Sequence, residues 1–216
     1  MDVYESKARG QIPVLGENDV MAKNTEIAKK LTIRLETHKD YKDIVSLVLR
    51  SFREGTGYSD GTDIVALIEE IRDSEYHIPE LSFVAELNGE IVGHFLFSHF
   101  PLSNTPQGGH GGAKDTEIVM LAPVSVHADH LRQGIGSEML RQGIGKVKEM
   151  GFKGITVEGD YHFYNTVGFR TSSGYGIYPT EGFPMTEPRC MMCMETFPGS
   201  LKGKGGYVVY DMYCNA

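Results

Sequence analysis

A predicted strand that leads through a glycine turn straight into an amphipathic helix constrains the fold of this chain more than any other feature. Residues 117–126, EIVMLAPVSV, are apolar and rich in β-branched side chains, which predicts a buried strand. From Gln133 to Met150 the apolar residues recur with the helical period, and Gly151 supplies a stop signal. The turn contains the stretch QGIG, residues 133–136. The sequence therefore predicts a strand–turn–helix unit.

The pentapeptide RQGIG occurs twice in this unit, at residues 132–136 and 141–145. The first copy forms the turn, and the second lies inside the helix about two and a half turns further on, so the copies face opposite ways. Gly143 falls on the apolar face, where a missing Cβ lets a helix lie close to a sheet. Gly145 falls on the polar face, and the sequence offers no physical account of it.

The first copy has the properties of a phosphate site. At a helix N-terminus the leading N–H groups lack intrahelical acceptors, and the macrodipole adds partial positive charge. A Walker loop requires Lys and Ser or Thr after its second glycine, and a dinucleotide fingerprint requires a third glycine. Ser137-Glu138 and Met139 stand at those places. The turn therefore predicts an anion site of another kind.

The rest of the chain supplies further predicted elements. Residues 31–37 alternate as a strand, after which Thr37 begins a helix with Asp40 at the capping-box position. A second helix is predicted from Thr62, residues 81–97 form a hairpin around Asn88-Gly89, and Pro101–Asp115 is a loop. Residues 1–30 show no sustained period and are either a flexible tail or a partner-binding arm.

A second motif lies downstream, in VEGDYHFYNTVGF, residues 157–169. Together with the glycine turn it resembles the GNAT superfamily of acyl-CoA-dependent N-acetyltransferases, in its YhbS-like branch. In that family a loop R/Q-x-x-G-x-G/A holds the pyrophosphate, and a Tyr stands four residues before Gly-Phe, as Tyr164 does here. Leu131 departs from the family at the first loop position, because Arg132 and Gln133 follow it. The resemblance covers about residues 31–213.

The resemblance implies an α/β (α+β) GNAT fold. That fold is a bent, mixed, mostly antiparallel sheet of about seven strands with helices on both faces. It also implies one domain over residues 31–216. The predicted order of elements, β-α-α-β-β-β-α-β-α-β-β, agrees with that arrangement.

The resemblance implies direct transfer of an acetyl group from acetyl-CoA, as cosubstrate, to a primary amine of a small molecule or protein. The expected cofactor-binding residues lie on the strand end and the loop: Val124, Ser125, Val126, Leu131, Arg132, Gln133, Gly134, Ile135, Gly136 and Ser137. Tyr164 is the expected proton donor to the leaving thiolate, although it also suits an aromatic core position. The alternative function is a catalytically silent GNAT-fold module that binds CoA as a sensor or interaction partner.

The proton acceptor is less well defined by the sequence. Glu86, Glu117 and Glu158 all lie on predicted strands, and Glu117, on the strand that leads to the loop, is the first choice. An amine of lowered pKa needs no dedicated base. By family position, the acceptor lies between residues 52–60, with Tyr58, and residues 172–188, with Tyr175, Tyr178 and Phe183; a lid is the alternative.

Other functional classes are disfavoured. The formal charge of −8 and the lack of a basic run argue against nucleic acid, and no apolar stretch approaches the roughly 18 residues of a membrane span. Three cysteines suggest a reducing cytoplasm. Neither His127-x-Asp129-His130 nor Cys190-x-x-Cys193, which lacks a second pair, is expected to bind a metal. The resemblance leaves a homodimer open.

Overall fold

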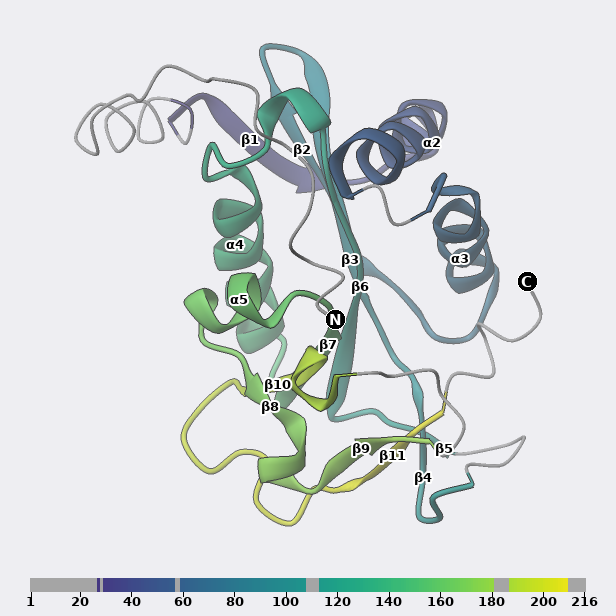
Figure 1. Cartoon of the computed structure of the whole chain (residues 1–216), viewed down its shortest axis with the longest axis vertical. Helices are drawn as coiled ribbons and strands as arrows, with labels where there is room; N and C mark the ends of the chain where they lie inside the picture. The colour runs from purple at the N-terminus through teal and green to yellow at the C-terminus, as the bar shows by residue number, and fades with distance from the viewer. Residues whose placement is uncertain (1–26, 28, 57–58, 108–112, 181–186, 210–216) are drawn as a thin grey trace.

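The fold is built on a seven-stranded sheet with helices on both faces (Figure 1). The structure is a computed structural model, and it describes residues 27, 29–56, 59–107, 113–180 and 187–209. The sheet has the order β1-β2-β3-β6-β7-β10-β8, and its neighbours are antiparallel except for the parallel pair β6 and β7. The strands are β1 Leu31–Leu35, β2 His77–Leu87, β3 Glu90–Ser98, β6 Ile118–Val126, β7 Gly154–Glu158, β8 Arg170–Thr171 and β10 Met191–Glu195. The predicted mixed, mostly antiparallel sheet is confirmed.

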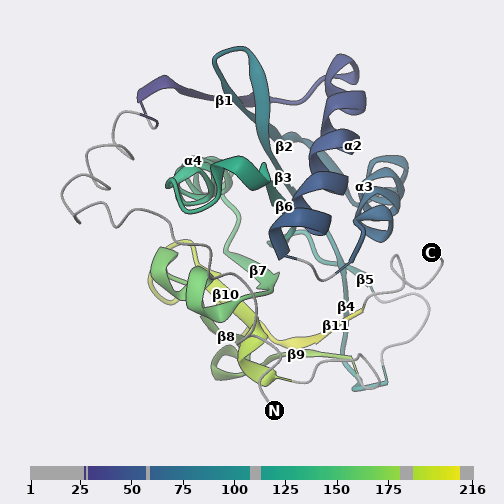
Figure 2. The same cartoon turned by 45° about the horizontal axis from the view of Figure 1, so that its top comes forward.

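Two groups of helices cover the two faces of this sheet. Helices α2 (Tyr41–Arg50) and α3 (Thr62–Asp73) lie on one face, and α4 (Ile135–Glu149) and α5 (Tyr161–Tyr164) lie on the other (Figures 1 and 2). A π-helical turn, η2 (Ser51–Thr56), extends α2. The 3-10 turns are η1 His38–Asp40, η3 Ala128–His130, η4 Asn165–Val167, η5 Ser172–Tyr175 and η6 Pro188–Cys190.

Local signals placed several of these elements correctly. Thr37 precedes the first helical turn, and its backbone N–H donates to the Asp40 carboxylate at 2.7 Å. Asn88 and Gly89 have φ values of 53° and 87°, so the β2–β3 hairpin has the left-handed turn that this residue pair favours. Helix α4 begins two residues later than predicted, because Arg132 and Gly134 have φ values of 60° and 82° and the chain turns before the helix.

The glycine in the middle of α4 brings the helix onto the sheet. A Cβ built on Gly143 would lie 2.4 Å from Phe95 Cε2 and 2.9 Å from Phe97 Cε2, closer than real contacts allow. The predicted close packing of Gly143 is therefore confirmed. Among the described residues, no atom outside the helix's own backbone and the neighbouring residues lies within 4 Å of a Cβ built on Gly145. Gly145 also lines a hollow of about 360 Å³ between α4 and the strands β1 and β2.

A second, four-stranded sheet was not predicted. Its order is β5-β4-β11-β9, formed by Ala113–Lys114, Pro101–Ser103, Gly206–Val208 and Ile177–Pro179. The prediction that residues 101–115 form only a loop is therefore wrong. Strands of two or three residues are too short to show an alternating pattern, and β4 pairs with β11, which lies about a hundred residues further along the chain.

The predicted boundary between an N-terminal segment and a single domain stays a prediction. Of residues 1–30, the structure describes Ile27, Lys29 and Lys30, and the Ile27 side chain packs against the core on the α4 face. Over the described residues, no helix is long and apolar enough to cross a membrane.

Candidate active site

The seven-stranded sheet opens between its two parallel strands. Strand β7 pairs with β6 from Ile118–Gly154 to Leu121–Val157, and the pairing ends there. Strand β6 continues to Val126 and remains paired with β3 on its other side. On the β7 side, the last five residues of β6 therefore have no strand partner among the described residues. We call this unpaired strand edge the opening, and the glycine turn follows it directly.

The backbone of β6 presents its polar groups to this opening at alternate residues. The His127 N–H donates to the Val92 carbonyl at 2.9 Å, so these two residues are a hydrogen-bonded pair between β6 and β3. In an antiparallel ladder, hydrogen-bonded and non-hydrogen-bonded pairs alternate. Ser125 is therefore also bonded to β3, whereas Val124 and Val126 direct their N–H and C=O groups away from β3. The Ser125 side chain is buried on the α2 and α3 face. These two valines match the family positions expected to bind the cosubstrate.

The loop between β6 and α4 directs backbone N–H groups outward. Gly134, with φ 82°, is the N-cap residue of the helix and, being a glycine, has no side chain to cap it. The first intrahelical bond at this end runs from the Glu138 N–H to the Gly134 carbonyl, so the N–H groups of Ile135, Gly136 and Ser137 lie ahead of the helical ladder. A Cβ on Gly136 would lie 3.3 Å from Phe163 Cζ. Because Gly136 has no side chain, the Phe163 ring of α5 can lie close to the first turn of α4.

The side chains of the loop hold it in place. Gln133 Nε2 donates to the Asp129 carbonyl at 2.9 Å. Leu131, at the position where the motif it resembles has a basic or amide side chain, is exposed and lies against η2, where a Cβ on Gly55 would lie 3.3 Å from Leu131 Cδ1. The departure from the family motif thus has a packing reason.

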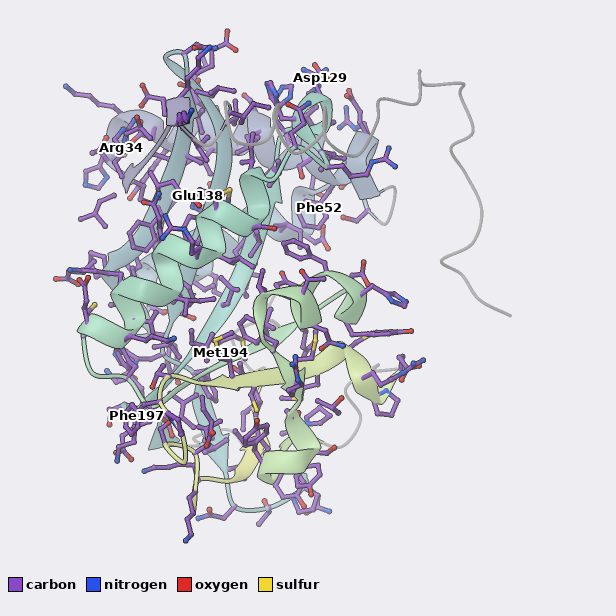
Figure 3. All side chains as sticks on the ribbon, turned by 90° about the vertical axis from the view of Figure 1, so that its left-hand side faces the viewer. Arg34, Phe52, Asp129, Glu138, Met194 and Phe197 are labelled. Atoms are coloured by element: carbon purple, nitrogen blue, oxygen red, sulfur yellow. The ribbon has the colours of Figure 1, made fainter. Side chains whose placement is uncertain are left out.

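An ion-pair cluster also joins the loop to η2. Arg50, at the end of α2, donates to both carboxylate oxygens of Asp129 at 3.2 and 3.0 Å and to Glu54 at 2.9 Å. Its third nitrogen lies 2.9 Å from His127 Nε2. In Figure 3, Asp129 lies ahead of α4 and Phe52 lies beside the same end of the helix. The loop between β6 and α4 is therefore linked to the end of α2 and to η2.

Tyr164 lies at the end of α5, beside the opening on the α4 face. Its side chain is 9% exposed and packs with the core between α4 and the sheet. Gly159 makes room for the ring, since a Cβ there would lie 2.8 Å from Tyr164 Cε2. Burial, with the nearby Asp160 charge, raises the pKa of Tyr164 above its ordinary value. The phenol therefore keeps its proton at neutral and mildly alkaline pH.

The structure separates Glu117 from this site. Glu117 precedes the first residue of β6, at the opposite end of the strand from Val124 and Val126, and seven residues of strand span roughly 23 Å. Its carboxylate pairs with Lys153 and Lys204. Both facts argue against Glu117 as the proton acceptor.

The other two candidate bases, Glu86 and Glu158, differ in how close they lie to the opening. Glu86 accepts from Arg34 at 3.1 Å on β2, away from the opening. Glu158 is the last residue of β7, directly after Val157, whose partner is the last paired residue of β6. Burial raises the pKa of the Glu158 carboxyl to about 8.

The remaining candidates from the sequence are the possible metal ligands, the cysteines and the aromatic residues expected near the acceptor. Within the described residues, no group of three or more His, Cys, Asp or Glu side chains is placed to hold a metal ion, and Asp129 instead pairs with Arg50. Cys193 is buried on β10, and Cys190 lies in the turn before it; both are free thiols. Tyr58 and Phe183, expected near the acceptor, lie outside the described residues, whereas Tyr175 lies in η5 and Tyr178 is exposed on β9.

A buried charged cluster under α2 and α3 was not predicted. The Glu36 carboxylate accepts two bonds from Arg72, at 2.9 and 2.8 Å, and its Oε2 lies 2.9 Å from His94 Nε2. Burial lowers the pKa of His94, so the ring is neutral and donates to Glu36. The sequence signal for this cluster was Arg72, a charged residue in α3 next to the buried Ile68 and Ile71.

Comparison with known proteins gives consistent matches. The profile of the Acetyltransferase (GNAT) family matches residues 42–169. The chain is 29% identical over 157 residues to YjhQ of Escherichia coli (strain K12), described as an uncharacterized N-acetyltransferase, covering 72% of this chain and 78% of YjhQ.

Two solved structures share the fold. YhbS from Escherichia coli, in complex with CoA, superposes with a TM-score of 0.69 at 23% identity, covering 87% of this chain and 93% of YhbS. A GNAT family acetyltransferase from Brucella melitensis, in complex with acetyl-CoA, superposes with a TM-score of 0.64 at 24% identity, covering 85% and 97%.

Proposed function

The chain belongs to the acetyltransferase (GNAT) family, and from that premise we propose that it moves the acetyl group of acetyl-CoA directly to a primary amine. The observation that carries the proposal is the opening between β6 and β7, which leads directly to the N-terminus of α4, where the N-cap residue is Gly134. A strand edge and a helix start, side by side, suit a ligand that combines an amide-bearing arm with a pyrophosphate.

The proposed cosubstrate site uses backbone groups at both parts. The N–H groups at residues 134–137 face the pyrophosphate, with the α4 macrodipole adding partial positive charge. The outward N–H and C=O groups of Val124 and Val126 bond the pantetheine arm and the thioester carbonyl as a strand would. Gln133 and Leu131 act indirectly, since their side chains hold the loop to Asp129 and to η2.

Tyr164 is the proposed proton donor. The amine nitrogen forms a bond to the thioester carbonyl carbon and releases one proton to water. The bond from that carbon to sulfur breaks, and the sulfur takes both the electron pair and the phenol proton. Tyr164 lies on the α4 face, where the cosubstrate loop begins. Its raised pKa keeps the phenol protonated at neutral pH and also makes it a weaker acid than a free tyrosine, so the proton-donor role rests on position and on the test below. Solvent returns the proton after the thiol leaves.

The acceptor is proposed to enter from the face that carries α2 and η2. Phe52 lies on η2, beside the N-terminal end of α4 (Figure 3). Arg50, directly before this turn, forms an ion pair with Asp129 in the loop before α4. A π-helical turn of this kind is often found at functional sites. The amine class stays open, since Tyr58 and Phe183 lie outside the described residues.

The test is thiol release from acetyl-CoA across a panel of small amines and peptides, repeated with Tyr164→Phe. The substitution keeps the ring and its packing but removes the hydroxyl. We expect kcat to fall by roughly 10²–10⁴-fold, the usual contribution of general acid catalysis, while calorimetric affinity for acetyl-CoA stays unchanged.

Two outcomes contradict the proposal in different ways. A wild-type protein that binds acetyl-CoA but releases no thiol with any amine is a binding module. A Phe variant within about threefold of wild-type kcat excludes the general-acid role of Tyr164 and leaves that residue to core packing.

A further inference from the structure

Strand β1 ends the large sheet, and its edge away from β2, called here the outer edge, pairs with no strand among the described residues. The Glu36 N–H donates to the Ser82 carbonyl at 3.0 Å and continues the β1–β2 ladder by one residue. Because bonded and non-bonded pairs alternate in an antiparallel ladder, Ile33 and Leu35 direct their N–H and C=O groups to the outer edge. The Leu35 carbonyl accepts from Arg34 Nη1 at 3.2 Å. The remaining groups can bond a further strand.

The hollow beside α4 adjoins this outer edge. Ile33 of β1 and Phe83 of β2 line it on the sheet side, and Gly145 is among the α4 residues that line it opposite. Leu35 points to the same face as Ile33 and is 46% exposed. Figure 1 shows β1 at the end of the sheet, beside α4. The outer edge and the hollow together suit an extended apolar segment, with backbone bonds along one side and a pocket for alternate side chains.

The chain carries such a segment before β1. Residues 1–26 lie outside the described residues, and the chain enters the described part at Ile27, whose side chain packs against the core on the α4 face. Residues 12–15, Ile-Pro-Val-Leu, are the longest apolar run within residues 1–26. Pro13 favours an extended conformation in the residue before it. Since proline has no N–H, it suits a strand that pairs on one side alone.

We propose that residues 11–15 of the same chain add an antiparallel strand to the outer edge of β1, with Ile12 and Val14 facing the hollow. The bonding direction alternates along a strand, so a strand in which Pro13 faces solvent directs the N–H groups of Ile12 and Val14 to β1. Directly opposed residues of an antiparallel pair point to the same face. The Ile12 and Val14 side chains therefore lie on the α4 face, as the Ile33 side chain does.

The connection to β1 is long enough for this pairing. Residues 16–26 are eleven residues and span up to about 36 Å, whereas the five residues of β1 span about 17 Å. A tethered segment has an effective concentration in roughly the millimolar range. It therefore binds the outer edge in preference to a second copy of the chain, and it covers an edge that would otherwise be open to such a copy.

The first experiment uses tryptophan fluorescence, because the chain contains no tryptophan of its own. It compares Val14→Trp with Val20→Trp, which replaces the same residue type in the same segment but outside the apolar run. We expect Val14→Trp to emit at shorter wavelength and to be quenched more weakly by acrylamide. Adding Ile12→Asp or Gly145→Phe to Val14→Trp should return both signals to those of Val20→Trp, whereas Gly145→Ala should leave them unchanged.

The second experiment measures amide hydrogen exchange without an introduced tryptophan. We expect the Ile33 N–H to be protected in the wild type and to exchange at least about tenfold faster in Val14→Asp. Val20→Asp should leave that rate unchanged. The Arg34 N–H bonds toward β2 and serves as the internal reference in every variant. Thermal melting establishes that each variant is folded.

The outcomes decide between the segment and other occupants. A solvent-exposed tryptophan in Val14→Trp, or an Ile33 exchange rate that Val14→Asp leaves unchanged, overturns the docking on β1. A tryptophan that stays shielded in a folded Gly145→Phe variant overturns the hollow as its site. Protection of Ile33 that falls on dilution, together with a dimer in sedimentation, assigns the outer edge to a second copy and overturns docking within one chain. If Gly145→Phe does not fold, the Ile33 exchange rate decides.

Discussion

The two glycines of the second RQGIG copy lie two residues apart on one helix, and we expect alanine to have opposite effects at them. At Gly145 the substitution removes backbone freedom from the unfolded chain, and the new Cβ meets none of the described neighbouring residues within 4 Å. The full difference in helix propensity, about 1 kcal/mol, should therefore appear as added stability. At Gly143 the same gain is set against a Cβ placed 2.4 Å from Phe95 Cε2.

The contact at Gly143 cannot be relieved by a flexible side chain. Phe95 is fully buried, stacks on Phe83 with centroids 5.0 Å apart, and meets Phe97 edge-on at 6.1 Å. Either the rings or α4 must move, and overpacking of this kind costs roughly 1–3 kcal/mol. Taking the upper value and subtracting the propensity gain leaves Gly143→Ala less stable by about 2 kcal/mol.

Urea unfolding at 25 °C measures both effects on one scale. The two variants should differ by about 3 kcal/mol in the free energy of unfolding, with unchanged m-values, and by roughly 6–12 °C in Tm. Acetyl-CoA affinity should be unchanged in Gly145→Ala, because that position lies far from the first copy of the motif. A Gly143→Ala protein as stable as Gly145→Ala would refute the close-packing argument, and weakened acetyl-CoA binding in Gly145→Ala would give the second copy a ligand role.

Two further predictions concern the cosubstrate loop and the buried cluster. Gly136→Asp places a carboxylate at the α4 N-terminus and crowds Phe163, so acetyl-CoA affinity should fall at least about tenfold by calorimetry; a folded variant that binds as tightly as the wild type excludes this loop as the pyrophosphate site. Burial opposes ionisation of Glu36, yet its bonds from His94 and Arg72 lower its pKa from 4.5 to about 2. A depressed carboxyl pKa stabilises the fold above the unfolded value, so about 3 kcal/mol should be lost as pH falls from 4.5 to 2. Arg72→Met should cost about 3–5 kcal/mol at pH 7 and flatten that acid limb; an acid limb identical to the wild type would show that another carboxyl carries it.

The strand–turn–helix unit was predictable because its determinants are local. The glycines of the turn, the period of α4 and the Asn88-Gly89 pair each act within a few residues of their own position. The close contact of Gly143 with the sheet could also be inferred, since a glycine on the apolar face of a helix leaves room for a neighbouring element to approach the backbone. Tyr164 was predicted from the family resemblance, through its place four residues before Gly168-Phe169, and its role stays a prediction.

Only the tertiary structure decided which glutamate borders the opening. Glu117 and Glu158 both stand at an end of a strand and cannot be told apart by sequence alone. Strand β7 runs parallel to β6 with Gly154 beside Ile118, so the register sets Glu117 at the closed end and Glu158 where the pairing stops. Strand β7 follows β6 only after the whole of α4, so no tight turn fixes their register, and the pairing joins segments that are distant in sequence. The small second sheet and the Glu36–Arg72–His94 cluster arose in the same way, from partners tens of residues apart.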